Sequence, residues 1–500
     1  MMKTHIAGVA AIMALLATGA GAADVVRIDA GALHGVTAGD VTSFKGVPYA
    51  QPPVGSLRWR GPESVLPWQG VRAADRYGAI CMQKISADNG VGPGPASEDC
   101  LTLNVFAPAA KARAPLPVMV WIHGGGFVNG SGTAALYDGS ALARQGVVVV
   151  TLNYRLGRFG FFAHPALIAE QRGAAPANYG LMDQIAALRW VKQNIAAFGG
   201  DPANVTIFGE SAGGMAVNRL MMIRQARGLF AKAIVESGVG RERGQTLAEA
   251  EADGAAFAAK LGATDNAASL RAIPADKIVA AGDPDVLTGE LPILDGVLLK
   301  ENPAEAFAAG RVARVPYLIG TNSLEFPAAW VGPLRAKLVQ LTPGQQAEAV
   351  KAYGGADRFN DHIVSDIVFG EPARLLAGGM AKRGGPVFLY RFSVVSAKTP
   401  KMLSAGASHA SDRQYVFKTL NASTWPTDAR DAALAETISA YWVAFAKTGD
   451  PNGEGRPRWP RYGADDRLIN FTNDGPVVEK TPDAAALDMI KSVADSAPKK

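Results

Sequence analysis

The segment that most constrains this chain is residues 204–214, NVTIFGESAGG. Its β-branched and aromatic side chains up to Phe208 predict a strand inside a covered sheet. Glycines follow where the chain must reverse sharply, and apolar residues return at helical spacing from Met215 onward. A G-x-S-x-G motif between a strand and a helix is typical of a nucleophile elbow. The segment therefore predicts that the Ser211 hydroxyl projects above the strand end, at the positive N-terminus of a helix. The alternative is a glycine-rich turn that carries a serine by chance.

The composition favours one large domain without a nucleic-acid partner. The length of 500 residues alone would suggest three domains, but no Pro/Ser-rich or charge-rich linker interrupts the apolar pattern. We therefore expect one domain over residues 23–500, with insertions. The formal net charge is only +5 and the lysines and arginines are scattered, so the chain has no nucleic-acid footprint.

The first 22 residues have the form of a signal peptide. Lys3 precedes an apolar run over residues 6–16, and residues 20–22 have the A-x-A form of a cleavage site. The run is too short to span a bilayer comfortably. We expect cleavage before Ala23 and a secreted or periplasmic protein without a membrane anchor; a retained anchor is the alternative.

The two cysteines, Cys81 and Cys100, both lie in the exported part. Two thiols on one short segment in an oxidising compartment predict a disulfide. The segment between them is rich in glycine and proline over residues 88–95. No histidine lies nearby, so these cysteines do not make a zinc site.

The remaining pattern alternates strands with helices, which predicts an α/β fold with a mainly parallel sheet flanked by helices. Active sites of such sheets lie at the carboxyl ends of the strands, where both Ser211 and the glycine run 124–126 fall. A helical insertion over residues 246–281 is expected to cover the sheet. The predicted strands are residues 101–106, 118–122, 146–152, 204–208, 231–236, 315–320 and 387–392, with an entry hairpin at 25–28 and 41–44; the other predicted helices are 185–198, 340–383 and 432–446.

A serine hydroxyl needs a neighbouring base to become a nucleophile. The chain has six histidines, and a base should sit on a loop above the sheet. His409 meets this condition in a loop after the strand at 387–392, whereas His362 falls inside a predicted helix. The other four fall in the signal peptide, the entry hairpin or segments with an expected structural role: His5, His34, His123 and His164. We therefore expect His409 to be the base, with a solvated loop histidine as the alternative.

The base in turn needs an orienting acid, which should lie between serine and histidine in chain order. Glu325 fits, on the loop after the strand at 315–320. Asp295 competes with it, although its Asp-Gly pair is also typical of an ordinary turn. A surface carboxylate is the alternative for Glu325.

Backbone N–H groups are expected to form an oxyanion hole. Gly125 and Gly126 follow a buried strand, and Ala212 follows the expected nucleophile. A phosphate cradle is the alternative for the glycines, but no P-loop lysine follows them. The sequence implies no metal and no cofactor.

With these residues in hand, the chain resembles the type-B carboxylesterase and cholinesterase family of α/β hydrolases, from about residue 25 to about residue 480. The matching motifs are KGVPYA at 45–50, LRWR at 57–60, EDCL at 98–101, HGGGF at 123–127, NYGLMDQ at 178–184, FGESAGG at 208–214 and TGDPN at 448–452.

The resemblance implies an α/β-hydrolase fold and an esterase whose triad is Ser211, Glu325 and His409. It also implies that Ser237 lies near this triad and that Asp412 braces the histidine loop. The other implied features are oxyanion donors at Gly125, Gly126 and Ala212, a Cys81–Cys100 disulfide, and ion pairs Arg58–Glu98 and Arg155–Asp183.

Two departures from the family bear on the substrate. Family members usually carry glycine after the acid, but Phe326 follows Glu325 here. The loop between the cysteines lacks the tryptophan that cholinesterases stack on a quaternary ammonium, so a choline ester is not the expected substrate. Phe127, Phe326 and Trp330 are candidate apolar walls of the substrate pocket, with core packing as the alternative for each.

The sequence thus predicts an exported serine hydrolase that acts on small carboxylic esters. An amide or carbamate, or a large ester such as a polyester fragment or an esterified toxin, is the alternative substrate for the same machinery. A non-catalytic binding protein is a remote alternative, because such relatives typically lose the nucleophile and Ser211 is present.

Overall fold

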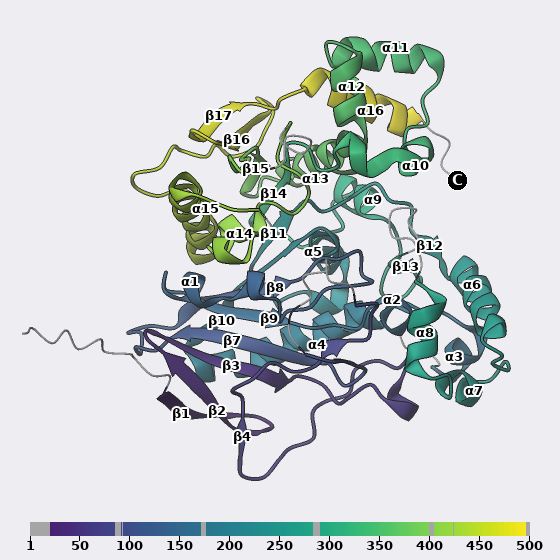
Figure 1. Cartoon of the computed structure of the whole chain (residues 1–500), viewed down its shortest axis with the longest axis vertical. Coiled ribbons are helices and arrows are strands. Elements are labelled where there is room, and N and C mark those ends of the chain that lie inside the picture. The colour runs from purple at the N-terminus through teal and green to yellow at the C-terminus, as the bar shows by residue number, and fades with distance from the viewer. Residues whose placement is uncertain are drawn as a thin grey trace, which may run out of the picture.

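A 13-stranded sheet runs through the protein. Figure 1 shows the arrangement of its strands in the computed structural model. The structure describes residues 21–85, 92, 94–171, 177–283, 291–399, 405–423 and 425–496. Its central strands, which are β9, β8, β10, β11, β14, β15 and β16 in spatial order, pair in parallel. Antiparallel strands extend the sheet at both ends. In spatial order they are β1 (Gly21–Ile28), β2 (Gly31–Ala38), β3 (Val41–Pro48), β7 (Thr102–Pro108), β9 (Val148–Leu152), β8 (Leu116–Ile122), β10 (Gly200–Glu210), β11 (Lys232–Glu236), β14 (Tyr317–Asn322), β15 (Val387–Phe392), β16 (Arg467–Thr472) and β17 (Gly475–Lys480), while β4 (Val71–Ala73) pairs with β2.

Helices cover both faces of this sheet, which explains why its central strands are apolar on both faces. Val120, Ile207 and Ile234 on the central strands have no exposed surface. One face packs against α4 (Tyr179–Asn194), α5 (Ala212–Met222), α9 (Pro303–Ala308) and α13 (Glu371–Ala381). The other face packs against α1 (Ser140–Ala143), α14 (Arg413–Val416) and α15 (Ala429–Thr448). The predicted α/β class and parallel sheet are confirmed.

The register of the central strands brings the chemistry-bearing loops to one edge. Phe208 of β10 pairs with Trp121 of β8, and Glu210 at the end of β10 pairs with Glu236 at the end of β11. The loops that follow β8, β10 and β11 therefore leave the sheet side by side.

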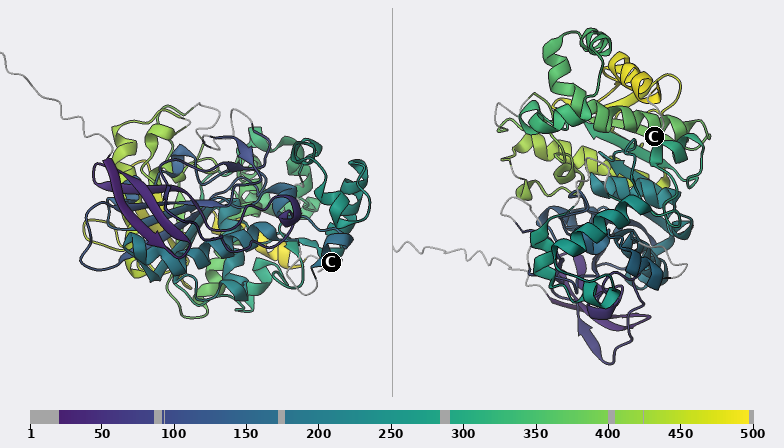
Figure 2. Two further views of the ribbon diagram at one scale, coloured as in Figure 1. Left: turned by 90° about the horizontal axis from the view of Figure 1, so that it is seen from below. Right: turned by 90° about the vertical axis from the view of Figure 1, so that its right-hand side faces the viewer.

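A cluster of helices stands apart from the sheet at the end that carries α16, visible at the top of both Figure 1 and the right-hand view of Figure 2. Its apolar core includes Phe359, Phe369 and Leu487. It comprises α10 (Ala328–Leu338), α11 (Pro343–Ala352), α12 (Ala356–Ser365), the π-helix η7 (Asp366–Gly370) and α16 (Ala484–Ser496).

The predicted insertion over residues 246–281 is helical, but the expectation that it covers the sheet is wrong. Its helices pack on a separate apolar cluster around Trp59, Phe162 and Tyr179, to which no strand contributes. The helices are α6 (Leu247–Lys260), α7 (Ala267–Arg271) and α8 (Ala275–Ala281).

The remaining elements are short connections. They are β5 (Ile80–Cys81) paired with β6 (Ala96–Ser97), β12 (Gln245–Thr246) paired with β13 (Ile293–Leu294), α2 (Gly157–Gly160), α3 (Pro165–Glu170), and the 3₁₀ helices η1 (Gly55–Leu57), η3 (Ala135–Tyr137), η4 (Ile195–Phe198), η5 (Arg224–Ala226) and η9 (Leu420–Ala422).

The disulfide between Cys81 and Cys100 is present, and both cysteines are buried. One partly buried and one buried ion pair hold the same region. Arg58 binds Glu98 through two nitrogens, at 2.6 and 2.5 Å, and Arg155 binds Asp183 at 2.8 and 2.7 Å. The structure thus contains both ion pairs that the family resemblance implied.

Replacing both cysteines by alanine is expected to lower the free energy of unfolding by about 3 kcal/mol, because the bridge restricts the unfolded chain. Urea denaturation of the double variant and the native protein measures this difference. Native protein unfolded in the presence of a reductant serves as the control and should match the variant. Equal midpoints for bridged and unbridged protein would contradict the prediction.

The predicted signal peptide over residues 1–22 lies almost entirely outside the described residues, which begin at Gly21 with β1. Cleavage before Ala23 would remove the first two residues of that strand. None of the described helices has the length and apolarity that crossing a bilayer requires.

Candidate active site

Ser211 lies in a sharp turn between β10 and α5. Its backbone has φ 55° and ψ −122°, a conformation that L-residues rarely adopt and that is typical of a strained functional turn. A Cβ atom on Gly209 or Gly213 would lie 2.6 or 2.0 Å from the carbonyl oxygen of Ile122. Both glycines of the motif are therefore needed, because the start of α5 presses against the end of β8.

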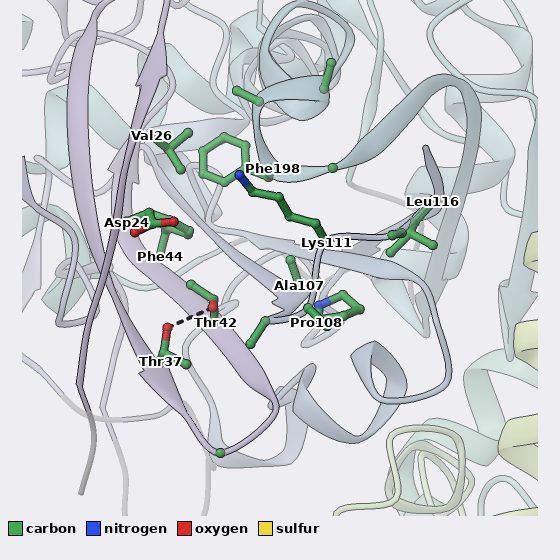
Figure 3. Close-up of a pocket in the computed structure, with 17 residues that line it drawn as sticks. Asp24, Val26, Thr37, Thr42, Phe44, Ala107, Pro108, Lys111, Leu116 and Phe198 are labelled. Atoms are coloured by element: carbon green, nitrogen blue, oxygen red, sulfur yellow. Dashed lines mark hydrogen bonds between the residues drawn. The ribbon is translucent and has the colours of Figure 1, made fainter. Parts of the chain in front are cut away.

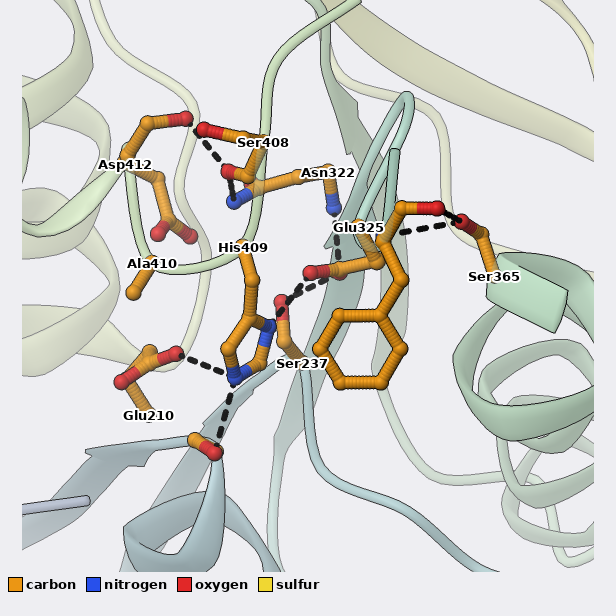
Figure 4. A network of polar contacts seen from close by, with 12 residues as sticks. Glu210, Ser237, Asn322, Glu325, Ser365, Ser408, His409, Ala410 and Asp412 are labelled. Atoms are coloured by element: carbon orange, nitrogen blue, oxygen red, sulfur yellow. Dashed lines mark hydrogen bonds and ion pairs between the residues drawn. The ribbon is translucent and has the colours of Figure 1, made fainter. Parts of the chain in front are cut away.

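The imidazole of His409 lies between Glu210 and Glu325 (Figure 4) and also contacts the serine hydroxyl. Its Nε2 atom is 2.9 Å from Ser211 Oγ, and its Nδ1 atom is 2.7 Å from Glu325 Oε2. The three residues come from loops after β10, β14 and β15. The structure therefore brings the predicted serine, acid and base into one chain of hydrogen bonds.

The carboxylate of Glu325 is held by its second oxygen. Oε1 accepts a hydrogen bond from Ser237 Oγ at 2.5 Å and another from the backbone N–H of Asn322 at 2.7 Å. The backbone N–H of His409 also donates to the Glu325 carbonyl at 2.8 Å. Ser237, expected near the triad, thus fixes the acid, and the Oε2 atom stays directed at the imidazole.

The glycine run after β8 makes an unusual left-handed turn beside the serine. Gly125, Gly126 and Phe127 have φ of 105°, 62° and 59°. A Cβ on Gly125 would lie 2.2 Å from the carbonyl oxygen of Asn129, so only glycine fits there. None of the described residues accepts a hydrogen bond from the N–H of Gly125 or Gly126. The N–H of Ala212 lies in the first turn of α5, where a helix offers no internal partner.

Glu210, the residue before the nucleophile, is a buried carboxylate that the sequence reasoning did not single out. Its Oε1 atom lies 3.3 Å from His409 Nε2, and its Oε2 atom lies 3.8 Å from Arg413 Nε. Burial raises the pKa of Glu210, and the positive charges of His409 and Arg413 act in the opposite direction. Its position in the G-x-S-x-G motif could have identified it, because this residue ends β10 and directly precedes the serine.

Asp412 lies deeper, behind the histidine loop. Its Oδ2 atom accepts a hydrogen bond from Tyr390 at 3.0 Å, and its side chain is completely buried. Burial raises the pKa of Asp412 well above its usual range, and the nearby Glu210 and Glu325 raise it further. The backbone N–H groups of Tyr415 and Val416 donate to the Asp412 carbonyl, so this residue begins α14 directly behind the catalytic loop.

Two phenylalanines pack against the imidazole. The ring centroid of His409 lies 5.4 Å from that of Phe326 and 4.9 Å from that of Phe369. Phe369 belongs to the π-helix η7, an element that is frequent at functional sites. Ser365, the residue before this π-helix, accepts a hydrogen bond from the N–H of Phe326 at 2.9 Å. Phe326 thus belongs to the site, and Phe369 and Ser365 were missed because their approach depends on tertiary packing.

The other two candidate pocket residues differ in their exposure. Phe127 has no exposed surface and packs edge-on against Phe161, so it is a core residue. Half of the Trp330 side chain, 50%, is exposed on α10, and its role as a pocket wall stays a prediction. Asp295, the rival acid, accepts hydrogen bonds from three backbone N–H groups of its own turn and from Asn178. His362 lies in α12, as predicted.

A surface hollow of about 750 Å³ opens at the opposite end of the sheet (Figure 3). It lies between the N-terminal hairpin and the loops that precede β8 and β10, and its walls include Phe44, Lys111 and Phe198. No histidine, serine or cysteine lines it. It therefore sits at the amino ends of the parallel strands, away from the triad.

The described residues contain no cluster of three or more histidine, cysteine or acidic side chains arranged to hold a metal ion.

Comparison with known proteins identifies the family. The model of the carboxylesterase family matches residues 22–341 and 344–490. The chain belongs to the carboxylesterase family. Para-nitrobenzyl esterase of Bacillus subtilis is 39% identical over 487 residues, which cover 92% of this chain and 97% of that protein. Fumonisin B1 esterase of Sphingopyxis macrogoltabida is 37% identical over 471 residues, which cover 89% of this chain and 86% of that protein.

Solved structures of carboxylesterases agree with this assignment. A PNB esterase superposes with a TM-score of 0.81 at 37% identity and covers 93% of this chain and 99% of its own. A thermophilic PNB esterase superposes with a TM-score of 0.82 at 36% identity, with the same coverage. The protein is therefore a carboxylic-ester hydrolase with the α/β-hydrolase fold.

The pH dependence of this carboxylesterase should follow His409. Burial opposes the charged imidazole, but Glu210 and Glu325 outweigh burial and raise the pKa of His409 above 6.5. A general base must be neutral to accept a proton, so kcat/KM for a short-chain ester should fall as the pH drops through a pKa above 6.5. Glu210→Gln removes one of the two carboxylates and should move this midpoint to lower pH. A native midpoint at or below 6.5 would contradict the prediction.

Proposed function

We propose that this chain is an exported serine carboxylesterase that hydrolyses carboxylic esters through an acyl-enzyme on Ser211. The observation that carries the proposal is the single hydrogen-bonded chain from Ser211 Oγ through the two nitrogens of His409 to Glu325 Oε2, at 2.9 and 2.7 Å. A serine, an imidazole and a buried carboxylate in this order are the parts of an activated nucleophile.

In the first half-reaction, Ser211 Oγ attacks the ester carbonyl carbon as its proton passes to His409 Nε2. Glu325 continues to accept the hydrogen bond from His409 Nδ1–H and stabilises the imidazolium ion that forms. The N–H groups of Gly125, Gly126 and Ala212 hold the oxyanion of the tetrahedral intermediate. When the intermediate collapses, the alcohol leaves with the proton from Nε2, and the acyl group stays on Ser211.

In the second half-reaction, His409 Nε2 takes a proton from water as the water oxygen attacks the acyl carbon. The same N–H groups hold the second oxyanion. Collapse returns the proton to Ser211 Oγ and releases the carboxylic acid, so the enzyme ends in its starting state. No metal ion or cofactor takes part.

Export is the second part of the proposal. The N-terminal sequence has the three regions of a signal peptide, and the disulfide between Cys81 and Cys100 suits an oxidising compartment. The mature chain would then be a single domain from residue 23 to residue 500, in the periplasm or outside the cell. Mass measurement of the protein recovered from outside the cytoplasm tests this part, because it locates the N-terminus of the mature chain.

Covalent labelling tests the acyl-enzyme directly. Diisopropyl fluorophosphate should inactivate the enzyme with one adduct per chain, and peptide mass spectrometry should locate that adduct on Ser211. Protein unfolded in urea before labelling is the control and should not react, because the hydroxyl is inert without its base. An adduct on another residue that accompanies full inactivation would overturn the assignment of Ser211.

The relatives differ in the esters for which they are named, from para-nitrobenzyl esters to fumonisin B1. The 37% identity to the fumonisin B1 esterase over 89% of this chain favours an esterified toxin as a second candidate substrate. A panel of esters graded by acyl length and alcohol size, together with an amide and a carbamate, separates these candidates by kcat/KM.

A further inference from the structure

A permanent positive charge lies beside the catalytic residues. The guanidinium of Arg413, four residues after His409, packs over the ring of Tyr137 at 5.9 Å and donates a hydrogen bond to its hydroxyl at 2.7 Å. Its Nε atom donates to the carbonyl oxygen of Ala410 at 2.9 Å and lies 3.8 Å from Glu210 Oε2. These contacts hold the charged group in one place.

The guanidinium is not fully enclosed by these contacts. Its Nη2 atom has no hydrogen-bond partner among the described residues, and this atom is not buried. The Arg413 side chain is 26% exposed, whereas that of Glu210 is only 2% exposed. The exposed charge at this place is therefore that of the arginine and not that of the carboxylate.

The surrounding charges leave Arg413 as the counterion of Glu210. Four carboxyl groups lie in this region. Glu325 is bound to His409, Asp412 accepts a hydrogen bond from Tyr390, and Glu236 accepts one from Trp442. The described residues include no other arginine or lysine within 4 Å of the Glu210 carboxylate.

Glu210, one member of this ion pair, lies beside the nitrogen that protonates the alcohol in the proposed reaction. In the proposed reaction His409 Nε2 gives its proton to the departing alcohol oxygen, and Glu210 lies 3.3 Å from the same nitrogen. The apolar rings of Phe326 and Phe369 pack against the same imidazole. A carboxylate next to an aromatic ring is the kind of site that attracts an organic cation, and here the guanidinium of Arg413 already lies 3.8 Å from the second oxygen of Glu210.

We propose that Arg413 is a specificity-determining residue that makes the alcohol side of this active site unfavourable for esters of cationic alcohols. This inference rests on the proposed function, since it names the substrate class of the same site. A second cation near Glu210 would meet the fixed charge of Arg413 in a partly buried place, where like charges several ångströms apart change binding by about tenfold or more.

Two thioesters of the same shape test the proposal on the native enzyme. Acetylthiocholine carries a quaternary ammonium, and S-(3,3-dimethylbutyl) thioacetate replaces that nitrogen with carbon. The native enzyme should hydrolyse the neutral thioester with a kcat/KM at least about tenfold higher than that of the cationic one. Equal values, or a preference for the cation, would overturn the proposal without any variant.

Variants then assign the effect to Arg413. Arg413→Met keeps most of the aliphatic stem and removes the charge, so the ratio of cationic to neutral kcat/KM should rise about tenfold or more. Arg413→Lys keeps the charge and should keep the native ratio. A matched control is Arg456→Met, which removes another arginine stacked on a tyrosine, Tyr441, at 4.8 Å in a loop after α15; its ratio should also stay native.

The neutral thioester separates the two ideas. If the native enzyme does not hydrolyse it, or hydrolyses it equally well as the Ser211→Ala variant, the proposed function fails. If hydrolysis depends on Ser211 but Arg413→Met leaves the cationic-to-neutral ratio unchanged, the charge assignment to Arg413 is wrong and the esterase stands.

Discussion

Replacing Ser211 by alanine is expected to lower kcat for a chromogenic short-chain ester by about 10⁶-fold, the loss that removal of a serine nucleophile causes when a whole triad depends on it. Alanine leaves His409 and Glu325 in place but gives the imidazole no hydroxyl to activate. Because Ser211 Oγ has one side-chain partner, His409 Nε2 at 2.9 Å, its removal should disturb little else. Binding should therefore survive, and an inhibitor that mimics the ester should still bind.

Steady-state kinetics and a thermal unfolding curve together measure this result. Ser43→Ala, on β3 at the far side of the sheet, is the matched control and should keep native kcat. The result also separates an enzyme from a non-catalytic binding protein, which would keep its affinity for its partner. A variant that folds normally and retains a tenth of native turnover would contradict the role of Ser211.

Replacing Glu325 by glutamine is expected to lower kcat by about 10⁴-fold, the size of effect seen when a triad acid becomes an amide. The reason lies in the hydrogen bonds of Glu325. Its Oε1 accepts from Ser237 Oγ and from the N–H of Asn322, so a glutamine must place its oxygen there and its NH₂ toward His409 Nδ1. Nδ1 then has to accept, Nε2 carries the proton, and the imidazole cannot take the proton of Ser211.

The matched control for this variant is Asp295→Asn, at the other acid that the sequence offered. Asp295 binds the N–H groups of Val297, Leu298 and Leu299, so its replacement should affect stability and not turnover. The kinetics of the two variants over a range of pH measure the difference. Equal activity of Glu325→Gln and the native enzyme would show that Glu325 does not set the tautomer of His409.

Much of this site is predictable from sequence because each part ends a strand. A buried strand followed by glycines predicted the role of Ser211, and a loop after a later strand predicted that of His409. Chain order admitted both Glu325 and Asp295, and Glu325 was favoured because it follows a buried strand whereas the Asp-Gly pair at 295–296 is typical of a turn. In a parallel sheet such loops meet at one edge, so local patterns were enough to gather residues that are far apart in the chain.

The parts that the sequence reasoning missed depend on contacts across the fold. Phe369 reaches the imidazole from a π-helix between α12 and α13, and no local pattern gives a π-helix at this place. The role proposed for Arg413 depends on its contacts with Glu210 and Tyr137, which lie on other elements. The entry hairpin was also wrong. Residues 25–28 and 41–44 were expected to pair with each other, but β2 lies between them and pairs with both. Gly35 lies within β2, where a Cβ would meet the Ser43 carbonyl oxygen at 2.5 Å.

The C-terminal hairpin was a signal that the sequence analysis overlooked. Asn473 and Asp474 stand between two β-rich runs and are followed by Gly475, a composition that is typical of a tight hairpin. The structure has β16 and β17 there, paired in antiparallel fashion. This hairpin closes the sheet next to β15, the strand from which the loop with His409 departs.

The separation of 198 residues between Ser211 and His409 has a consequence for how the enzyme matures. Contacts between such distant parts of a chain form slowly, because a long loop must close before they can hold. A ribosome-bound chain that has completed β10 but not the loop after β15 has its nucleophile and no base. Recovery of esterase activity after dilution from denaturant should thus trail the recovery of far-ultraviolet circular dichroism, and the enzyme would report on the completion of its own folding.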